Sequence, residues 1–409
     1  MRRDPPDARQ RPRPARRARP GPDVSAAALH RYRRALEGLI GIPATEGNSI
    51  DVLRNGVEIF PAMLDAVREA TSTIDLTTYV YWTGDIAVAF ADALSERAAA
   101  GVRVRVLLDA VGAYSMNRDL VTQMTDAGCH VEWFRLPPKV KLRQANNRTH
   151  RKVLVCDEDV AFIGGVGIAE EWEGDARDPS EWRDTHLRVR GPAVDGLRAA
   201  FVSNWAETGR VLFDETDRFP EQPQSGDSMV QVVQCPSQMG WSELATAMAA
   251  LIKLAEHRLR ITNAYFVPDE HFRDRLCEAA AKGVEVDVLV PGEHTDKRVV
   301  QAAGEADYAT LLAAGVRIWR YRPTMLHAKV MTVDGMVTTL GSANFDNRSL
   351  RLNEEANLVI FDPAVVEVLD GHFAEDLARS DQVHSHEWAR RGPVQRVHEA
   401  VTELFDDQL

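Results

Sequence analysis

A duplicated pattern constrains the fold of this chain more than any other feature. The pattern H-x-K-x4-D occurs once as His150, Lys152 and Asp157, and again as His327, Lys329 and Asp334. The two copies start 327 − 150 = 177 residues apart. After six intervening residues each copy reaches a glycine, in Gly164-Gly165 and in Gly341-Ser342-Ala-Asn344. Two copies with matched downstream glycines indicate an internal duplication.

The spacing within each copy predicts a chemical site. Side chains two residues apart point to the same side of a strand, so each His and its Lys share one face. The residues that follow are β-prone and apolar, as in Val153–Val155, which favours a buried strand. Two copies brought together supply two imidazoles and two ammonium groups. One His could attack a phosphodiester, the other protonate the leaving oxygen, and the lysines bind the free oxygens.

The duplication extends well beyond the motifs. Both halves alternate helical and strand-like segments, which predicts an α/β fold. Matching stretches include AAAGVRVRVLLDA (98–110) with AAAKGVEVDVLVPG (279–292), and DAGCHVEWFR (126–135) with AAGVRIWRYR (313–322). We therefore expect two similar α/β domains whose active site lies at a pseudo-twofold interface, covering residues 48–215 and 229–409 and joined by a polar linker at 216–228.

The N-terminal region has a different composition. Residues 1–24 are rich in Arg and Pro and are predicted to be disordered. Residues 25–47 contain apolar residues at helical spacing with arginines on the other faces, which predicts an amphipathic helix and a connector. The tail is either a solvated segment or a basic segment drawn to anionic lipids. The helix either packs on its own protein or lies at a membrane interface.

Charge and apolar patterning limit the function classes. The net charge of −12 disfavours a general nucleic-acid binder. No apolar run approaches the roughly 20 residues of a membrane span, and no secretory segment precedes the fold. Four cysteines without C-x-x-C spacing favour a reduced, cytoplasmic setting and disfavour a zinc site. We expect neither a metal nor a cofactor.

At these motifs the chain resembles the phospholipase D superfamily, and more narrowly its bacterial cardiolipin synthase branch. The resemblance runs from about Ile40 to Asp362 and includes stretches outside the motifs: NGVEIFPAMLDAV (55–67), TYVYW (78–82), WRDTHLRVRGPAV (182–194), AYFVPDE (264–270), MLHAK (325–329) and GSANFDNRSLRLNEE (341–355). It implies two α/β domains with one active site between them, a covalent phosphohistidine intermediate and no metal.

The resemblance also implies roles for individual residues. His150 matches the nucleophile and His327 the general acid. Lys152, Lys329, Asn344 and Ser342 match ligands of the substrate phosphate, and Glu171 and Glu355 match carboxylates that orient a histidine. Asp157 and Asp334 are expected to be structural. Where the branch has Gly-Gly-x-Asn, this chain has Gly167 in place of Asn; loss of one phosphate donor costs on the order of 3 kcal/mol, or a hundredfold in rate.

Other polar residues near the motifs have blander interpretations. His186 is expected to pack or hydrogen-bond, and His384 and His386 to lie on the surface. The basic run Lys139, Lys141, Arg143 and Arg148 is either a solvated loop or a surface that attracts an anionic headgroup.

The leading hypothesis is a phosphatidyltransferase that joins two phosphatidylglycerol molecules and releases glycerol. A phospholipase D-type hydrolase differs only in that water intercepts the intermediate. A nuclease and a non-catalytic membrane-associated scaffold are the further alternatives. A lipid substrate requires membrane contact, so we expect peripheral binding to the inner face of an anionic membrane, through the helix at 29–40, the basic tail or loops near the site.

Overall fold

The computed structural model describes residues 25–136, 146–210, 220–236 and 242–388. Three predicted features lie outside these described residues: the tail at 1–24, residues 216–219 of the linker, and the basic residues Lys139, Lys141 and Arg143. The predictions made for them stay predictions.

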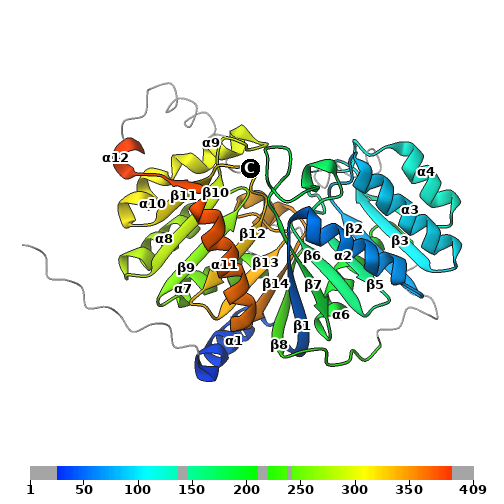
Figure 1. Cartoon of the computed structure of the whole chain (residues 1–409). Helices are drawn as coiled ribbons and strands as arrows, with labels where there is room; N and C mark the ends of the chain where they lie inside the picture. The colour runs from blue at the N-terminus through cyan, green and yellow to red at the C-terminus, as the bar shows by residue number, and fades with distance from the viewer. Residues whose placement is uncertain (1–24, 137–145, 211–219, 237–241, 389–409) are drawn as a thin grey trace, which may run out of the picture.

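The first half of the chain begins with a helix and then alternates strands with helices (Figure 1). Its elements are α1 (Ala26–Ile40), β1 (Thr45–Arg54), α2 (Asn55–Glu69), β2 (Thr73–Thr78), α3 (Asp85–Ala99), β3 (Arg103–Asp109), α4 (Arg118–Asp126), β4 (His130–Phe134), β5 (Val153–Cys156), β6 (Val160–Gly164), η1 (Glu170–Trp172), β7 (Thr185–Arg190) and α6 (Ala193–Ala206).

The second half repeats this order. Its elements are β8 (Ser228–Cys235), α7 (Glu243–Leu254), β9 (Arg258–Asn263), α8 (Glu270–Ala281), β10 (Glu285–Pro291), α9 (Arg298–Ala306), α10 (Tyr308–Ala314), β11 (Arg317–Tyr321), β12 (Lys329–Val333), β13 (Val337–Gly341), η2 (Arg348–Leu352), β14 (Glu355–Phe361), α11 (Pro363–Ala378), β15 (Ser380–Gln382) and α12 (Ser385–Trp388).

The strands form one continuous sheet that reveals the duplication. Their order is β15-β11-β10-β9-β12-β13-β14-β8-β1-β7-β6-β5-β2-β3-β4. Outward from the β8–β1 pair, the two sides repeat the same sequence of strands. On each side three strands run parallel, β2-β3-β4 and β9-β10-β11, and the motif strand pairs antiparallel with the first of them. The predicted α/β fold of two similar units is confirmed.

Helices cover both faces of this sheet (Figure 1). In the first half α2, α3 and α4 enclose one apolar core with β2, β3 and β5, and in the second half α7, α8 and α10 enclose another. A third core lies at the seam, where α6 and α11 pack over the central strands of both halves. The seam is therefore a buried apolar interface, and it holds the two motif strands in a constant relation.

Helix α1 packs one side against the second half of the chain. Ser25 caps its first turn, and Gly41 ends it with a φ of 71°. Its buried residues Ala28, Tyr32 and Leu36 belong to the core of the second half. The Tyr32 hydroxyl also donates to Asp334 at 2.8 Å. The buried side of α1 therefore packs on protein while Leu39 stays 59% exposed, and the membrane contact predicted for this helix stays a prediction.

Candidate active site

The two motif histidines lie at equivalent places in the two halves. His150 and Lys152 lie just before β5. His327 lies just before β12, and Lys329 is the first residue of that strand. All four side chains are buried, at 2 to 8% exposure. The pKa of each histidine is lowered in part by the lysine of the opposite copy, so the two copies act on one another's charge. The structure thus brings the two motifs into one site.

Each histidine is held by the backbone of the other half. The His150 N–H donates to the Glu354 carbonyl at 2.9 Å, and the His327 N–H donates to the Arg183 carbonyl at 2.7 Å. These contacts belong to two isolated bridges, Thr149 with Glu354 and Arg183 with Leu326. The residue after each carbonyl is a carboxylate, so each half delivers an acid to the histidine of the other.

Glu355 is the acid beside His150. Its Oε1 lies 2.9 Å from His150 Nδ1, and its other oxygen accepts the Ser342 hydroxyl. Glu355 is fully buried. A carboxylate only accepts hydrogen bonds, so Nδ1 carries the proton and Nε2 is left as the nucleophilic nitrogen.

Asp184 is the acid beside His327. Its Oδ2 lies 2.8 Å from His327 Nδ1 and also accepts the Trp172 indole N–H at 2.9 Å. The resemblance matched Glu171 to a carboxylate that orients a histidine, but the carboxylate that contacts His327 is Asp184. Within the described residues, Glu171 Oε2 is buried without a hydrogen-bond partner. The signal that could have found Asp184 was its position in the quoted stretch WRDTHLRVRGPAV, where it enters β7.

Burial controls the protonation of the histidines. It lowers the pKa of His150 to about 3 and that of His327 to about 4, against the opposing pull of Glu355 and Asp184. Both imidazoles are therefore neutral at pH 7 in the empty site. A neutral His150 is the form that can attack phosphorus.

The lysines are tuned in the same direction. Burial, followed by repulsion from Lys329, lowers the pKa of Lys152 to about 7, and burial lowers that of Lys329 to about 8. Each ammonium donates to the carbonyl of its own motif histidine, Lys152 at 2.9 Å and Lys329 at 2.6 Å. A bound anion would stabilise the charged forms, which suits a phosphate site.

Asn344 is the remaining polar group that the sequence assigned to phosphate. It is 4% exposed, and its Oδ1 is buried with no hydrogen-bond partner among the described residues. Ser342, by contrast, is turned toward Glu355. Its hydroxyl therefore supports the carboxylate of His150, and the phosphate role predicted for Ser342 stays a prediction.

The motif aspartates contact backbone rather than the histidines. Asp157 accepts the N–H groups of Thr71, Ser72 and Thr73 at 2.7 to 2.9 Å. Asp334 accepts those of Glu256, His257 and Arg258 at 2.7 to 2.8 Å. Each carboxylate thereby secures the turn that leads into a neighbouring parallel strand.

The other candidate residues lie apart from this chemistry. His186 is buried, and neither ring nitrogen has a partner among the described residues. Arg148 is 2% exposed and pairs with Asp109 at 3.0 Å, so it is neither a solvated loop residue nor a surface cation. His384 and His386 are exposed and stacked on each other. In the described part of the chain no group of three or more His, Cys, Asp or Glu could hold a metal ion.

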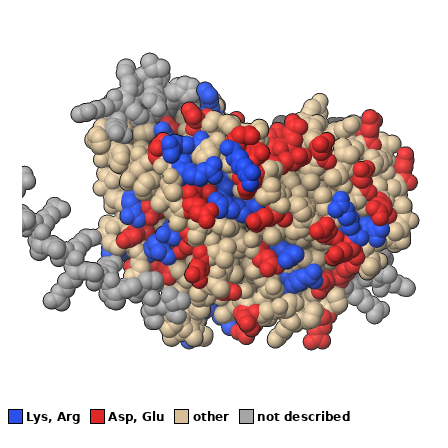
Figure 2. Space-filling view, in the orientation of Figure 1, with Lys and Arg blue, Asp and Glu red and all other residues tan. Residues whose placement is uncertain are grey.

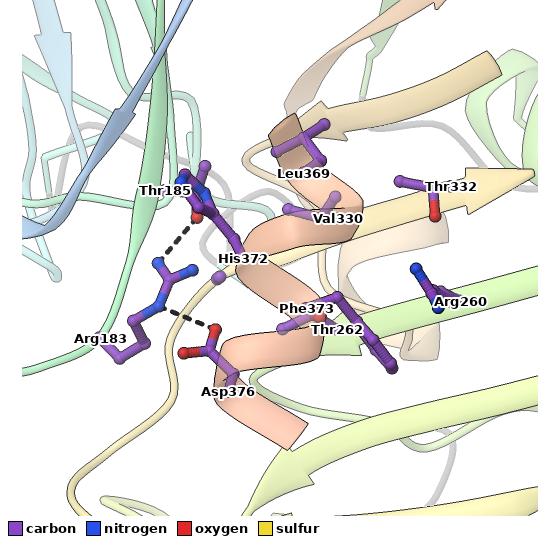
Figure 3. A pocket seen from close by; sticks show the side chains of 11 residues that line it. Arg183, Thr185, Arg260, Thr262, Val330, Thr332, Leu369, His372, Phe373 and Asp376 are labelled. Atoms are coloured by element: carbon purple, nitrogen blue, oxygen red, sulfur yellow. Dashed lines mark hydrogen bonds and ion pairs between the residues drawn. The ribbon is translucent and has the colours of Figure 1, made fainter. Parts of the chain in front are cut away.

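A pocket with a mixed polar and apolar lining lies between α11 and the Arg183 segment (Figure 3). The Arg183 guanidinium donates to Asp376 on α11 at 2.9 Å and to the Thr185 hydroxyl at 2.9 Å. Arg54 binds Asp376 as well, at 2.8 Å. Helix α11 thus anchors Arg183, whose carbonyl accepts the His327 N–H and which is followed directly by Asp184.

Comparisons with known sequences identify similar proteins. The family model described as "Cardiolipin synthase, PLD-like domain" matches residues 63–171 and 248–377. A probable cardiolipin synthase, YwiE, of Bacillus subtilis (strain 168) is 34% identical over 88% of this chain and 72% of its own length. Cardiolipin synthase 2 of Staphylococcus epidermidis (strain ATCC 12228 / FDA PCI 1200) is 30% identical over 89% of this chain and 75% of its own length.

Solved structures show the same fold at low sequence identity. The phosphatidylserine synthase of Haemophilus influenzae Rd KW20 superposes with a TM-score of 0.69 at 16% identity, covering 93% of this chain and all of its own. The polyphosphate kinase of Porphyromonas gingivalis gives a TM-score of 0.57 at 15% identity, covering 96% of this chain and 58% of its own. These likenesses concern the fold alone.

Proposed function

Because this chain belongs to the phospholipase D-like cardiolipin synthase family, we propose that it joins two phosphatidylglycerol molecules into cardiolipin and releases glycerol. The observation that carries the proposal is the pair of buried His–carboxylate–Lys sets in one site. Such a set supplies a nucleophile, an acid–base group and cations for a phosphodiester.

In the first step His150 attacks the donor. Its Nε2 forms a bond to phosphorus, and the bond from phosphorus to the glycerol oxygen breaks. A protonated His327 gives its proton to that oxygen, and glycerol leaves. The anionic phosphodiester and Asp184 both favour the imidazolium form of His327, although burial disfavours it in the empty site.

In the second step the acceptor is used. His327, now neutral, takes the proton of a glycerol hydroxyl on the second phosphatidylglycerol. The resulting oxygen attacks phosphorus, and the phosphorus–nitrogen bond to His150 breaks. Cardiolipin forms, His150 is free again and His327 is again protonated. Lys152, Lys329 and Asn344 bind the non-bridging oxygens throughout. Water in place of the acceptor would yield phosphatidic acid, which is the hydrolase outcome.

The direct test is to incubate the purified protein with phosphatidylglycerol vesicles and to analyse the lipids by mass spectrometry. We expect cardiolipin and glycerol, and far less of both from His327→Ala. Phosphatidic acid without cardiolipin would replace the transferase with a hydrolase. No change in the lipid would refute the proposed function.

We further propose that the rim of the site, rather than helix α1, contacts an anionic membrane. No helix in the described residues is long and apolar enough to cross a bilayer. Val111, Tyr114 and Val299 are large apolar side chains exposed by 52%, 76% and 50%. They follow β3 and β10, which are equivalent strands of the two halves.

Both rim segments rest on tyrosines beside the histidines. Gly112 lies so close to Tyr79 that a Cβ there would come within 2.3 Å of the Tyr79 carbonyl oxygen, and the Tyr79 ring is 5.0 Å from the His150 ring. In the other half Lys297 lies over the Tyr265 ring at 5.1 Å, and Tyr265 is 6.3 Å from His327. An apolar rim at this place would let a lipid headgroup reach the site while its acyl chains stay in the bilayer.

Vesicle sedimentation tests the rim. The double variant Val111→Asp, Tyr114→Asp should bind phosphatidylglycerol vesicles more weakly, with unchanged thermal stability. Val57→Asp and Val368→Asp are matched controls, because these valines are 50% and 45% exposed on α2 and α11. Equal losses in the controls would refute the rim proposal.

Figure 2 shows Lys and Arg side chains gathered above α11 with acidic side chains around them, so charge on this face is mixed.

A further inference from the structure

The carboxylates of the two half-sites are held by different donors. Beside His150, the Ser342 hydroxyl donates to Glu355. The equivalent position in the first half is 342 − 177 = 165, which is a glycine. A Cβ on Gly165 would lie 2.3 Å from Asp184 Oδ1, so no serine fits there while Asp184 keeps its place.

Trp172 supplies the missing donor beside His327. Its indole N–H reaches Asp184 Oδ2 at 2.9 Å, and its ring is 1% exposed. The same oxygen lies 2.8 Å from His327 Nδ1, while Asp184 Oδ1 accepts the Thr185 N–H at 2.8 Å. At the same sequence offset, 172 + 177 = 349, the second half has a buried serine. The two halves thus exchange a small donor for a large one at different positions.

The same tryptophan accounts for Gly167. A Cβ at this position would lie 2.7 Å from Val80 Cβ and 3.2 Å from Trp172 Cζ3. Val80 and Trp172 therefore occupy the space that an asparagine side chain would need. Trp172 also packs edge-on against the His327 ring at 5.1 Å, and Trp182 contacts the same ring at 5.4 Å. These rings close one side of His327 off from water.

We propose that Trp172 is a positioning residue that holds Asp184 through its indole N–H, in place of the serine hydroxyl that serves Glu355. His327 consequently works in an aromatic half-site, and His150 in a polar one. This proposal rests on the proposed function for its kinetic consequence but not for the hydrogen bond itself. A second N–H on Oδ2 draws charge from the oxygen that stabilises the His327 imidazolium.

The variant Trp172→Phe keeps an aromatic ring and removes the N–H. We expect kcat to fall about 10- to 100-fold, the loss typical of one hydrogen bond to a charged group, with little change in KM. The pH limb of kcat governed by His327 should move to higher pH. Without the indole N–H, Asp184 keeps more charge on the oxygen beside His327, and this raises the pKa of the imidazole. Trp182→Phe is the matched control, since it alters a ring on His327 and leaves Asp184 untouched.

A second measurement does not depend on activity. In protein labelled with ¹⁵N-histidine, the proton on His327 Nδ1 should resonate further downfield in Trp172→Phe than in the wild type, and unchanged in Trp182→Phe. If Trp172→Phe has a lower melting temperature than the wild type, benzothienylalanine at position 172 is used instead, because it keeps both rings and lacks the N–H. It should give the same shift.

The outcomes separate the two proposals. An unmoved His327 proton and a pH profile like that of Trp182→Phe would show that Trp172 merely packs, and would overturn the inference. A moved proton in an enzyme that leaves phosphatidylglycerol unchanged would support the inference and refute the proposed function.

Discussion

The half-site around His150 and the half-site around His327 share one backbone plan and differ in their side chains. In both, a motif histidine lies just before a buried strand, and a carboxylate from the other half meets its Nδ1 at 2.9 or 2.8 Å. Around His150 the supporting groups are the Ser342 hydroxyl and the Tyr79 ring. Around His327 they are Trp172, Trp182 and Tyr265.

The difference shows what a duplicated site must keep and what it can exchange. A buried carboxylate needs its lone pairs satisfied, but a hydroxyl, an indole and a backbone N–H can each do this. The histidine and its acid recur in both halves, while the donor behind the acid has changed position and type. Divergence of this kind would suit the proposed division of roles, with His150 as the nucleophile and His327 as the general acid.

The largest expected effect comes from removing either histidine. His327→Ala should lower transfer by about 10²- to 10⁴-fold, the range of general acid–base catalysis, and His150→Ala should lower it further because no covalent bond can form. Intact-protein mass spectrometry after mixing with phosphatidylglycerol should detect a phosphatidyl adduct in His327→Ala. An adduct in His150→Ala instead would reverse the assignment of the two roles.

Removing the carboxylates sharpens the same comparison. Asp184→Asn and Glu355→Gln should each lower kcat about 10²- to 10⁴-fold, because the histidine loses its tautomer and the support of its charged form. Glu171→Gln should remain near wild type, since among the described residues its carboxylate makes no hydrogen bond to a histidine. Steady-state kinetics with phosphatidylglycerol would decide this, and a severe loss in Glu171→Gln would restore the sequence-based assignment.

Substitutions at Asn344 and at the matching position Gly167 should affect different properties, catalysis at the first and stability at the second. Asn344→Ala should lower kcat about a hundredfold if its amide binds the transferring phosphate. Gly167→Asn restores the family residue, yet it should lower stability by about 1 to 3 kcal/mol through overpacking against Val80 and Trp172. Val80→Ala added to Gly167→Asn should recover part of that loss. Urea unfolding gives the stability, and a gain in activity from Gly167→Asn alone would contradict the packing argument.

The lysines should produce an alkaline limb. We propose that Lys152 and Lys329 bind phosphate when charged, and burial is the largest cause that lowers their pKa values in the empty site, to about 7 and about 8. As pH rises through these values the charged forms are lost, so kcat/KM should fall by about tenfold per pH unit for each lysine titrated. The limb of kcat should lie higher, because bound phosphate stabilises the ammonium groups. A flat kcat/KM up to pH 10 would exclude the lowered values.

The smallest expected effect concerns the two motif aspartates, which differ in the side-chain hydroxyl that each accepts. Asp334 accepts the Tyr32 hydroxyl in addition to backbone, whereas Asp157 accepts the Thr71 hydroxyl. Tyr32→Phe should lower the free energy of unfolding by about 0.5 to 1.5 kcal/mol, the net value of one hydrogen bond. Vesicle binding should not change, because α1 packs on the second half. Weaker vesicle binding by Tyr32→Phe at equal stability would indicate that α1 contacts the membrane.

Much of the fold could be predicted from local pattern. The parallel strands and their helices follow from short apolar runs that end at glycines, as at Gly101 and Gly315. The duplication then implied that the halves are alike. The place of α1 could not be predicted, because an amphipathic helix has the same sequence pattern on a protein core as on a bilayer.

The sequence by itself determined the two histidines, the two lysines and Glu355, because fixed spacing on a strand, and the family stretch GSANFDNRSLRLNEE, carry them. Only the tertiary structure decided that Asp184 rather than Glu171 serves His327, and that Trp172 takes over a donor role. The reason is that each acid acts on the histidine of the opposite half. A pairing across the seam depends on how two distant segments pack, and spacing along one segment does not record it.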